Sequence, residues 1–262
     1  MEYKNKKRRF NQPPRKKYSS NEMIYGIQPV LEALDAGKEF DKILVLRETS
    51  NEQLAEITKI ANTLNVPISR VPEEKLNRIT GKNHQGVIGF ISAIQFASLD
   101  NIISETYQEG KIPFILVLDR VTDVRNFGAI ARTAECAGMQ AVVIPAKGAA
   151  QIGSDAMRSS AGALNHISVC RTESLNQTIT YLQESGLQVV GCSEKGGDTI
   201  YDVDYTVPTA IVMGSEEDGI SDDIIKQADT LAKIPMGGKV SSLNVSVAAG
   251  IIIFEALRQK NS

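Results

Sequence analysis

The stretch IPFILVLD, residues 112–119, constrains the fold of this chain more than any other. Strands buried on both faces of a parallel sheet are continuously apolar, whereas half-exposed strands alternate apolar and polar residues. Similar short runs recur downstream as AVVIP (141–145), LQVVGCS (187–193) and TAIVMG (209–214), with helix-like spacing between them. This alternation predicts an α/β fold in which helices cover both faces of an open, mainly parallel sheet.

The chain divides into four predicted segments. The first, residues 1–20, is a basic arm, and the second, residues 21–95, is a small α/β domain with strands at 42–46, 66–71 and 86–92 and helices at 21–37 and 51–64. A polar helix or linker follows at 96–111. The last segment, residues 112–262, holds the sheet, with further strands at 166–170 and 231–235 and helices at 127–138, 154–164, 174–185, 222–228 and 244–258.

The formal net charge of -2 hides an uneven distribution. Residues 1–20 carry eight basic side chains against Glu2 alone, so the rest of the chain carries a net charge of -9. A basic, proline-containing segment with few apolar residues is expected to be disordered and to lie on a phosphate backbone. A tail that only improves solubility is the alternative.

Other compositional features exclude several protein classes. No apolar run is long enough to span a membrane, and the N-terminus lacks the apolar core of a secretory signal, which favours the cytoplasm. The cysteines Cys136, Cys170 and Cys192 are far apart and are joined by only two histidines, so no metal site is expected. Three free thiols in a reducing compartment are the simplest interpretation.

Ligands of open parallel sheets bind at the carboxyl ends of the strands, which directs attention to the loops after Leu118, Met213 and Ile234. In the first loop, Asn126 precedes the helix and could simply cap it, worth ~1 kcal/mol, and Arg132 could be a solvated helix residue. In the second, glycines bracket an acidic turn that contains Glu216, so the backbone can approach a ligand closely.

The third loop, IPMGGKVSSLN (234–244), sets glycines, serines and asparagine directly before an apolar helix. Neither a Walker phosphate loop nor a dinucleotide-binding glycine pattern is present. The helix is apolar on nearly all sides, so another helix or a second chain is expected to cover it. Such a permissive loop is suited to holding a cofactor.

Three ordered motifs, VTDVRNFGAIARTAECAG, IVMGSEEDGIS and IPMGGKVSSLNVSVAAGIIIFEAL, resemble the SpoU (TrmH-type) branch of the SPOUT RNA 2'-O-methyltransferases. In the N-terminal part, YGIQPVLEAL (25–34) and NHQGV (83–87) resemble an RNA-binding domain similar to ribosomal protein L30e. The pairing is most similar to the members that methylate a guanosine of 23S ribosomal RNA. The resemblance implies a C-terminal domain with a deep trefoil knot, S-adenosylmethionine as cofactor, RNA as partner and a homodimer formed through that domain.

The resemblance also implies roles for individual residues. The cofactor-binding positions that match are Gly214, Ile234, Met236 and Leu243, and the catalytic positions that match are Asn126, Arg132, Glu216, Ser242 and Asn244. Asn126, Ser242 and Asn244 are suited to orienting a ribose. Because a guanidinium stays protonated, Arg132 is interpreted as a phosphate clamp that stabilises the nascent alkoxide, and not as the base.

Two alternatives stay open at this point. One is a transfer RNA 2'-O-methyltransferase, whose catalytic domain would look the same. The other is a non-catalytic RNA-binding protein that keeps the fold, and the presence of the whole catalytic set argues against it.

Deletion of residues 1–18 tests the role of the basic arm. We expect the variant to bind RNA more weakly and with a shallower dependence of log K on log salt, because fewer counterions are released, while its affinity for S-adenosylmethionine stays the same. Filter binding across a salt series measures this slope. An unchanged slope would indicate that the arm only improves solubility.

Overall fold

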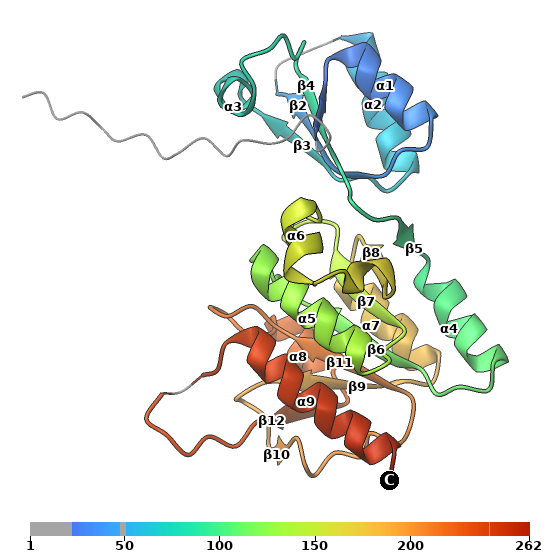
Figure 1. Ribbon diagram of the computed structural model, residues 1–262, viewed down its shortest axis with the longest axis vertical. Coiled ribbons are helices and arrows are strands. Elements are labelled where there is room, and N and C mark those ends of the chain that lie inside the picture. The colour runs from blue at the N-terminus through green and yellow to red at the C-terminus, as the bar shows by residue number, and fades with distance from the viewer. Residues whose placement is uncertain (1–22, 48–50, 241) are drawn as a thin grey trace, which may run out of the picture.

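The computed structural model describes residues 23–47, 51–240 and 242–262. The chain forms a small N-terminal lobe and a larger C-terminal lobe joined by an extended segment (Figure 1). The predicted basic arm lies outside the described residues.

The larger lobe is built on an eight-stranded sheet in the order β10-β12-β9-β11-β6-β7-β8-β5, and all of its pairs are parallel. Its strands are β5 (Phe96–Ala97), β6 (Phe114–Leu118), β7 (Ala141–Pro145), β8 (Ser168–Thr172), β9 (Gln188–Cys192), β10 (Asp198–Thr199), β11 (Thr209–Met213) and β12 (Thr230–Lys233). From β6 the chain proceeds to β7 and β8 on one side, while β11 and β9 lie on the other. The strand order therefore reverses between β6 and β11, the position where open sheets bind ligands.

Helices cover both faces of this sheet. One face packs on α5 (Val124–Cys136), α6 (Ser154–Ser159), the short 3₁₀ helix η1 (Ala163–Asn165) and α9 (Val245–Lys260). The other packs on α4 (Leu99–Gln108), α7 (Leu175–Glu184) and α8 (Asp222–Gln227). Every residue of β6 is buried, because alternate side chains enter the two opposite cores. The predicted doubly covered parallel sheet is confirmed.

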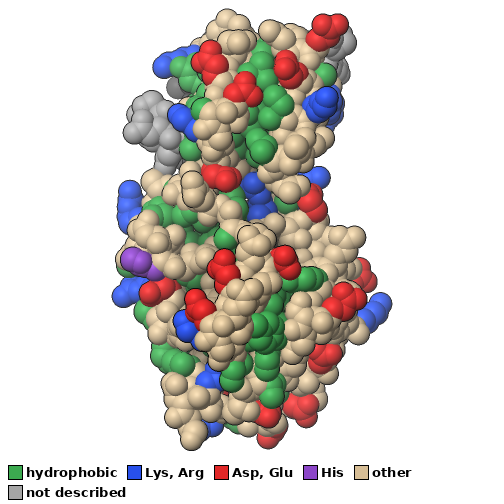
Figure 2. All heavy atoms as spheres, turned by 90° about the vertical axis from the view of Figure 1, so that its right-hand side faces the viewer, with side chains coloured by type: hydrophobic (Ala, Val, Ile, Leu, Met, Phe, Trp, Pro, Cys, Tyr) green, Lys and Arg blue, Asp and Glu red, His purple; other side chains and the backbone are tan. Residues whose placement is uncertain are grey.

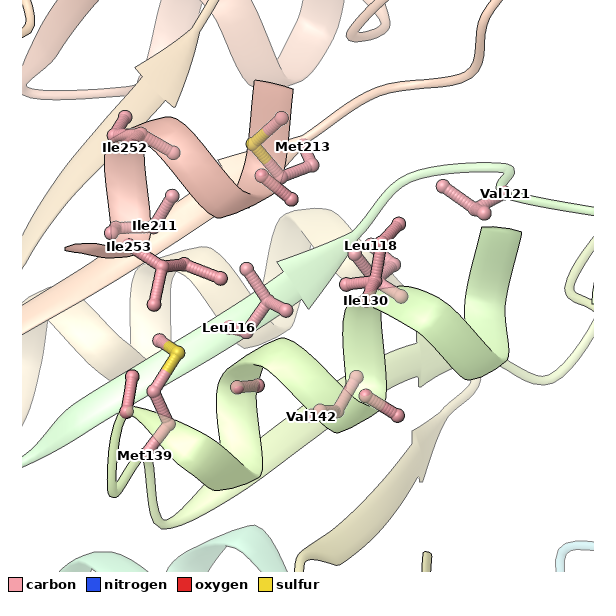
Figure 3. Packing of buried hydrophobic residues seen from close by; sticks show 14 of the residues in the cluster. Leu116, Leu118, Val121, Ile130, Met139, Val142, Ile211, Met213, Ile252 and Ile253 are labelled. Atoms are coloured by element: carbon pink, nitrogen blue, oxygen red, sulfur yellow. The ribbon is translucent and has the colours of Figure 1, made fainter. Parts of the chain in front are cut away.

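Helices α5 and α9 lie side by side over the centre of the sheet (Figures 1 and 3). Leu116, Ile211 and Ile253 meet in the buried cluster between strands and helices, together with Ile130 of α5 (Figure 3). This packing fixes the amino-terminal ends of both helices beside the carboxyl ends of β6 and β11. The loops that carry candidate functional residues are therefore held together by the main core.

The N-terminal lobe is a four-stranded mixed sheet in the order β1-β4-β2-β3. It contains β1 (Met23–Tyr25), β2 (Phe40–Leu46), β3 (Ile68–Val71) and β4 (Val87–Ile91), with α1 (Ile27–Asp35) and α2 (Glu52–Thr63) on one face and α3 (Glu73–Ile79) on the other. The expected α/β character is confirmed. The helix expected from Asn21 starts only at Ile27, because residues 23–25 pair with β4 as a strand.

The NHQGV motif has a structural role in this lobe. The Gln85 side-chain oxygen accepts a hydrogen bond of 3.0 Å from the backbone N–H of Ile27 at the start of α1. His84 is buried, and its Nδ1 accepts from the backbone N–H of Gly86 while Nε2 meets Asn77 Oδ1 at 3.1 Å. The motif therefore ties α1 and α3 to the start of β4.

Residues 96–111, expected as a linker, contain β5 and α4, and Ile103 is buried in a core of the larger lobe. Polar contacts join the two lobes nearby. Arg171 Nη1 donates to the carbonyl of Phe40 at 2.9 Å, and the Arg171 guanidinium lies 4.0 Å from the centre of the Phe96 ring. Asp41 accepts from the backbone N–H of Ile152, and burial raises the pKa of this carboxyl above its usual value.

The surface turned toward the viewer in Figure 2 shows acidic side chains scattered over both lobes, with basic ones between them. No single large basic patch occupies this face. Within the described residues, no helix is both long and apolar enough to cross a membrane.

Candidate functional site

Three loops meet at the carboxyl edge of the sheet, as the sequence predicts. They follow β6, β11 and β12, and the first two are adjacent because Leu118 pairs with Met213 in register. The backbone N–H of Asp119 extends this pairing by donating to the carbonyl of Met213 at 2.8 Å.

Helix α5 starts earlier than expected, and this frees a candidate catalytic side chain. The helix was expected from Phe127 with Asn126 as a possible cap, but it begins at Val124. Asp123 is the cap, since its Oδ1 accepts from the backbone N–H groups of Arg125 and Asn126 at 2.7 and 3.0 Å. The capping interpretation of Asn126 is wrong. Its amide, in the first turn of α5, is available for other contacts.

The side chain of Asn244 joins the three loops. Its Nδ2 donates to Asn126 Oδ1 at 3.1 Å and to Glu216 Oε1. Its Oδ1 accepts from the backbone N–H of Ser246 at 3.0 Å, which caps α9. One carboxamide therefore starts a helix with its oxygen and binds two other loops with its nitrogen.

The turn after β11 depends on two glycines. A Cβ on Gly214 would lie 2.0 Å from the carbonyl carbon of Gly219, so only glycine allows the two ends of the turn to approach. Gly219 has a φ of 67°, and it exchanges two backbone hydrogen bonds with Ser215. The turn is thus closed on itself, which presents Glu216 at its tip.

Two cavities flank this turn. The first, of about 370 Å³, is lined by residues of all the loops after β9, β11 and β12, including Gly214, Ile234, Met236, Ser242 and Leu243. The second, of about 420 Å³, is lined by the loop after β6, including Asp123 and Asn126. Residues 215–218 and Val245 line both, so the turn that carries Glu216 is the wall between them.

The first cavity suits a cofactor with apolar and polar parts. Its lining combines apolar side chains such as Ile234 and Leu243 with the exposed residues 216–219 of the turn. Its volume lies within the usual range for small-ligand sites, ~300–1,000 Å³. All four predicted cofactor-binding residues line it: Gly214, Ile234, Met236 and Leu243.

The predicted catalytic residues do not all lie together. Asn126, Glu216 and Asn244 are in hydrogen-bond contact, and Ser242 lines the first cavity. Arg132 is exposed on α5, six residues beyond Asn126, and lines neither cavity. Six residues are 1.67 helical turns, which directs Arg132 to a different side of α5 from Asn126.

Two residues of the site were not predicted. Cys192 at the end of β9 lines the first cavity, and burial raises the pKa of its thiol to about 11. Asp119 is 3% exposed, and its Oδ2 accepts from the backbone N–H of Ser221 at 2.7 Å. A charged residue that ends an apolar strand was the signal for Asp119, whereas nothing in the sequence marked Cys192.

Comparison with known proteins shows which families this chain resembles. The SpoU rRNA Methylase family matches residues 113–254, and the family of RNA 2'-O ribose methyltransferase substrate-binding domains matches residues 23–97. YacO of Bacillus subtilis, named for the TrmH family of tRNA/rRNA methyltransferases, is 33% identical, with 92% of this chain and 97% of YacO covered. The 23S rRNA (guanosine-2'-O-)-methyltransferase RlmB of Vibrio parahaemolyticus is 37% identical, with 92% and 98% covered.

Solved structures of SpoU methyltransferases are also similar to this chain. The crystal structure of the SpoU methyltransferase AviRb from Streptomyces viridochromogenes in complex with AdoMet has a TM-score of 0.58 and 25% identity, covering 91% of this chain and 90% of AviRb. The matched ranges include the three loop motifs as far as residue 254 and residues 23–95 of the N-terminal lobe. This chain belongs to the SpoU rRNA methylase family.

Proposed function

We propose that this protein transfers the methyl group of S-adenosylmethionine to a ribose 2'-hydroxyl of a guanosine in 23S ribosomal RNA. The observation that carries the proposal is the Asn126–Asn244–Glu216 cluster at the wall shared by two cavities. A methyl transfer needs donor and acceptor on opposite sides of one reacting centre, held in line. Two adjoining cavities with one polar cluster between them meet that need.

The first cavity is the proposed cofactor site. Gly214, Ile234, Met236 and Leu243 would hold S-adenosylmethionine, with apolar side chains against its adenine and methionine parts and backbone groups at its polar edges. When bound, the cofactor supplies an electrophilic sulfonium methyl. The residues of this chain supply the shape of the pocket and the exclusion of water from it.

The second cavity is the proposed ribose site. Asn126 and Asn244 carry amide groups that can donate to and accept from ribose hydroxyls, and Ser242 adds a hydroxyl on the cofactor side. Glu216 accepts from Asn244 and so fixes which way that amide points. Arg132 is the proposed phosphate clamp, because a guanidinium binds phosphate oxygens in a bidentate manner and stabilises developing negative charge.

Support for a ribosomal substrate comes from the whole length of the chain. The RlmB relative is covered over both lobes, and the N-terminal lobe matches a substrate-binding family. We therefore propose that residues 21–95 bind RNA and that the protein acts in the cytoplasm. A transfer RNA substrate is the second candidate, since YacO is named for both RNA classes.

The proposal is tested by methyl transfer from radiolabelled S-adenosylmethionine to total RNA from a strain that lacks the gene. The expected result is one alkali-resistant 2'-O-methyl guanosine in 23S RNA. Label found only in transfer RNA would show that the proposed substrate is wrong while the proposed reaction is right. A protein that binds the cofactor but labels neither free RNA nor ribosomal precursor particles would contradict the proposed activity.

We also propose a homodimer formed through the C-terminal domain. Phe254 and Val247 on α9 are 49% and 50% exposed, and α9 packs on α5, which carries the exposed Arg132. A second copy that covers this surface would bury the apolar side chains and bring its own Arg132 to the site. The trefoil knot expected for this domain stays a prediction.

Replacement of Gly214 by alanine is expected to abolish cofactor binding, because the added Cβ would enter the backbone of Gly219 and open the turn. Gly81→Ala, in the N-terminal lobe, is the matched control, since a Cβ there meets nothing within 4 Å. Isothermal titration with S-adenosylhomocysteine measures both variants. Equal affinity of Gly214→Ala and wild type would show that the turn does not shape the cofactor site.

Asn244→Asp is expected to lower kcat by about 10²-fold with little change in the KM for S-adenosylmethionine. The substitution keeps the cap of α9 but replaces the Nδ2 donor by an oxygen that repels Glu216. Asn101→Asp, an exposed residue of α4, is the control. Steady-state kinetics of methyl transfer gives both constants. A normal kcat in Asn244→Asp contradicts the role of the cluster.

Subunit mixing tests the origin of Arg132. Arg132→Ala and Asn244→Asp homodimers should each be nearly inactive. If the partner supplies Arg132, unfolding and refolding them together in equal amounts should restore about one quarter of wild-type activity, because half of the dimers are mixed and each has one intact site. No recovery in mixtures shown by sedimentation to be dimeric would place Arg132 in its own chain's site, and a monomeric wild type would overturn the dimer.

A further inference from the structure

Arg120, which directly follows β6, has an unusual backbone conformation. Its φ is 58°, in the left-handed region that non-glycine residues seldom adopt. Such a conformation persists when surrounding contacts hold it in place. The contacts of the Arg120 side chain are therefore expected to matter to the molecule.

The guanidinium of Arg120 reaches the turn after β11, about a hundred residues away in sequence. Nη1 meets Asp218 Oδ2 at 3.3 Å, and Nη2 donates to the carbonyl of Gly219 at 3.2 Å. Nε donates to Asp119 Oδ1 at 3.2 Å. All three nitrogens of the planar guanidinium therefore form a contact, in an arrangement that the single ammonium group of lysine cannot reproduce.

Asp119 extends the same connection. Its carboxylate is buried, and its other oxygen accepts from the backbone N–H of Ser221 at the start of α8. Asp119 and Arg120 together therefore bind residues 218, 219 and 221, which form the second half of the turn. Arg120 also supplies the counter-charge for the buried carboxylate of Asp119.

The turn held in this way is the wall between the two cavities. Residues 215–218 line both, and Gly219 also lines the first, while Arg120 itself lines only the second. The backbones of Gly214 and Gly219 are so close that a Cβ on Gly214 would lie 2.0 Å from the carbonyl carbon of Gly219. Displacement of Gly219 would therefore move the backbone around Gly214. The position of residues 218–219 thus sets the shape of the first cavity.

We infer that Arg120 is a positioning residue that holds the 214–221 turn in the arrangement that binds the cofactor. The inference rests on the proposed assignment of the first cavity to S-adenosylmethionine. Within the described residues, Arg120 forms hydrogen bonds with Asp119, Asp218 and Gly219 and with no side chain of the Asn126–Asn244–Glu216 cluster, so it acts through the turn.

Arg120→Gly separates this role from a general structural one. Glycine adopts a φ of 58° without steric cost, which offsets part of the stability that is lost when Asp119 loses its counter-charge, so the melting temperature should fall by only about 2–4 °C. The turn loses its guanidinium contacts at the same time, so the Kd for S-adenosylhomocysteine should rise about tenfold. Because the variant stays folded well below its melting temperature, a rise in the Kd measured there reports the shape of the site and not a loss of global stability.

Two further variants refine the test. Asp218→Asn removes only the exposed ion pair, which is screened by solvent, and should raise the Kd by no more than about threefold. Lys147→Gly, which removes an exposed cation from the neighbouring loop, is the matched control and should leave the Kd unchanged.

The experiment is isothermal titration of the full chain with S-adenosylhomocysteine, combined with thermal melts and with kinetics at saturating RNA. The expected result for Arg120→Gly is a raised Kd for S-adenosylhomocysteine and a raised KM for S-adenosylmethionine, both measured well below the melting temperature of the variant. A Kd within twofold of wild type overturns the inference and leaves the proposed function intact. A raised Kd also overturns it if the melting temperature of the variant falls to that of the titration, because unfolding alone would then account for the lost affinity. Failure of the wild type to bind rejects the cofactor site and this inference with it.

Discussion

The side-chain amide of Asn244 is the contact on which the architecture of the site depends. Its oxygen caps α9, the helix that packs over the centre of the sheet, and its nitrogen binds the loops after β6 and β11. The same group thus couples the main hydrophobic core to the polar cluster between the two cavities. Because both the oxygen and the nitrogen of the amide form hydrogen bonds, a change in its orientation would also disturb the start of α9.

This coupling works because the sheet brings the loops together first. Parallel pairing of β6 with β11 sets Asp119 beside Met213, and the reversal of strand order at this place leaves room above the strand ends. Glycine at 214 then lets the turn after β11 fold back on itself. Sheet register, a glycine turn and one amide are sufficient to position residues that are more than a hundred positions apart in sequence.

The strongly periodic parts of the fold were predictable from the sequence. Continuous apolar runs such as 114–118 identify doubly buried strands, and β7 was expected at the residues where it occurs. Short elements were missed because they carry little pattern: β10 has two residues, and α3 follows a proline without a clear apolar stripe. The start of α5 was misplaced because Asp123 and Asn126 are both good capping residues, and only the structure distinguishes them.

The candidate site was predictable in its loops and less so in its contacts. Glycines and polar residues after apolar strands marked the places, and the resemblance to SpoU enzymes supplied the candidate roles. The sequence could not indicate that Arg132 lies outside both cavities, because helix position alone does not define which loops surround it. Nor could it reveal the positive φ of Arg120, since arginine seldom adopts one and no local pattern marks it.

The central claim is that the cavity beneath the 214–219 turn holds S-adenosylmethionine with its reactive end toward the Asn126–Asn244–Glu216 cluster. A crystal structure with bound S-adenosylhomocysteine tests it most directly. The account predicts the ligand between Ile234, Leu243 and Gly214, with its sulfur directed toward the second cavity. A ligand bound elsewhere, or bound with its sulfur directed away from the cluster, would contradict the account.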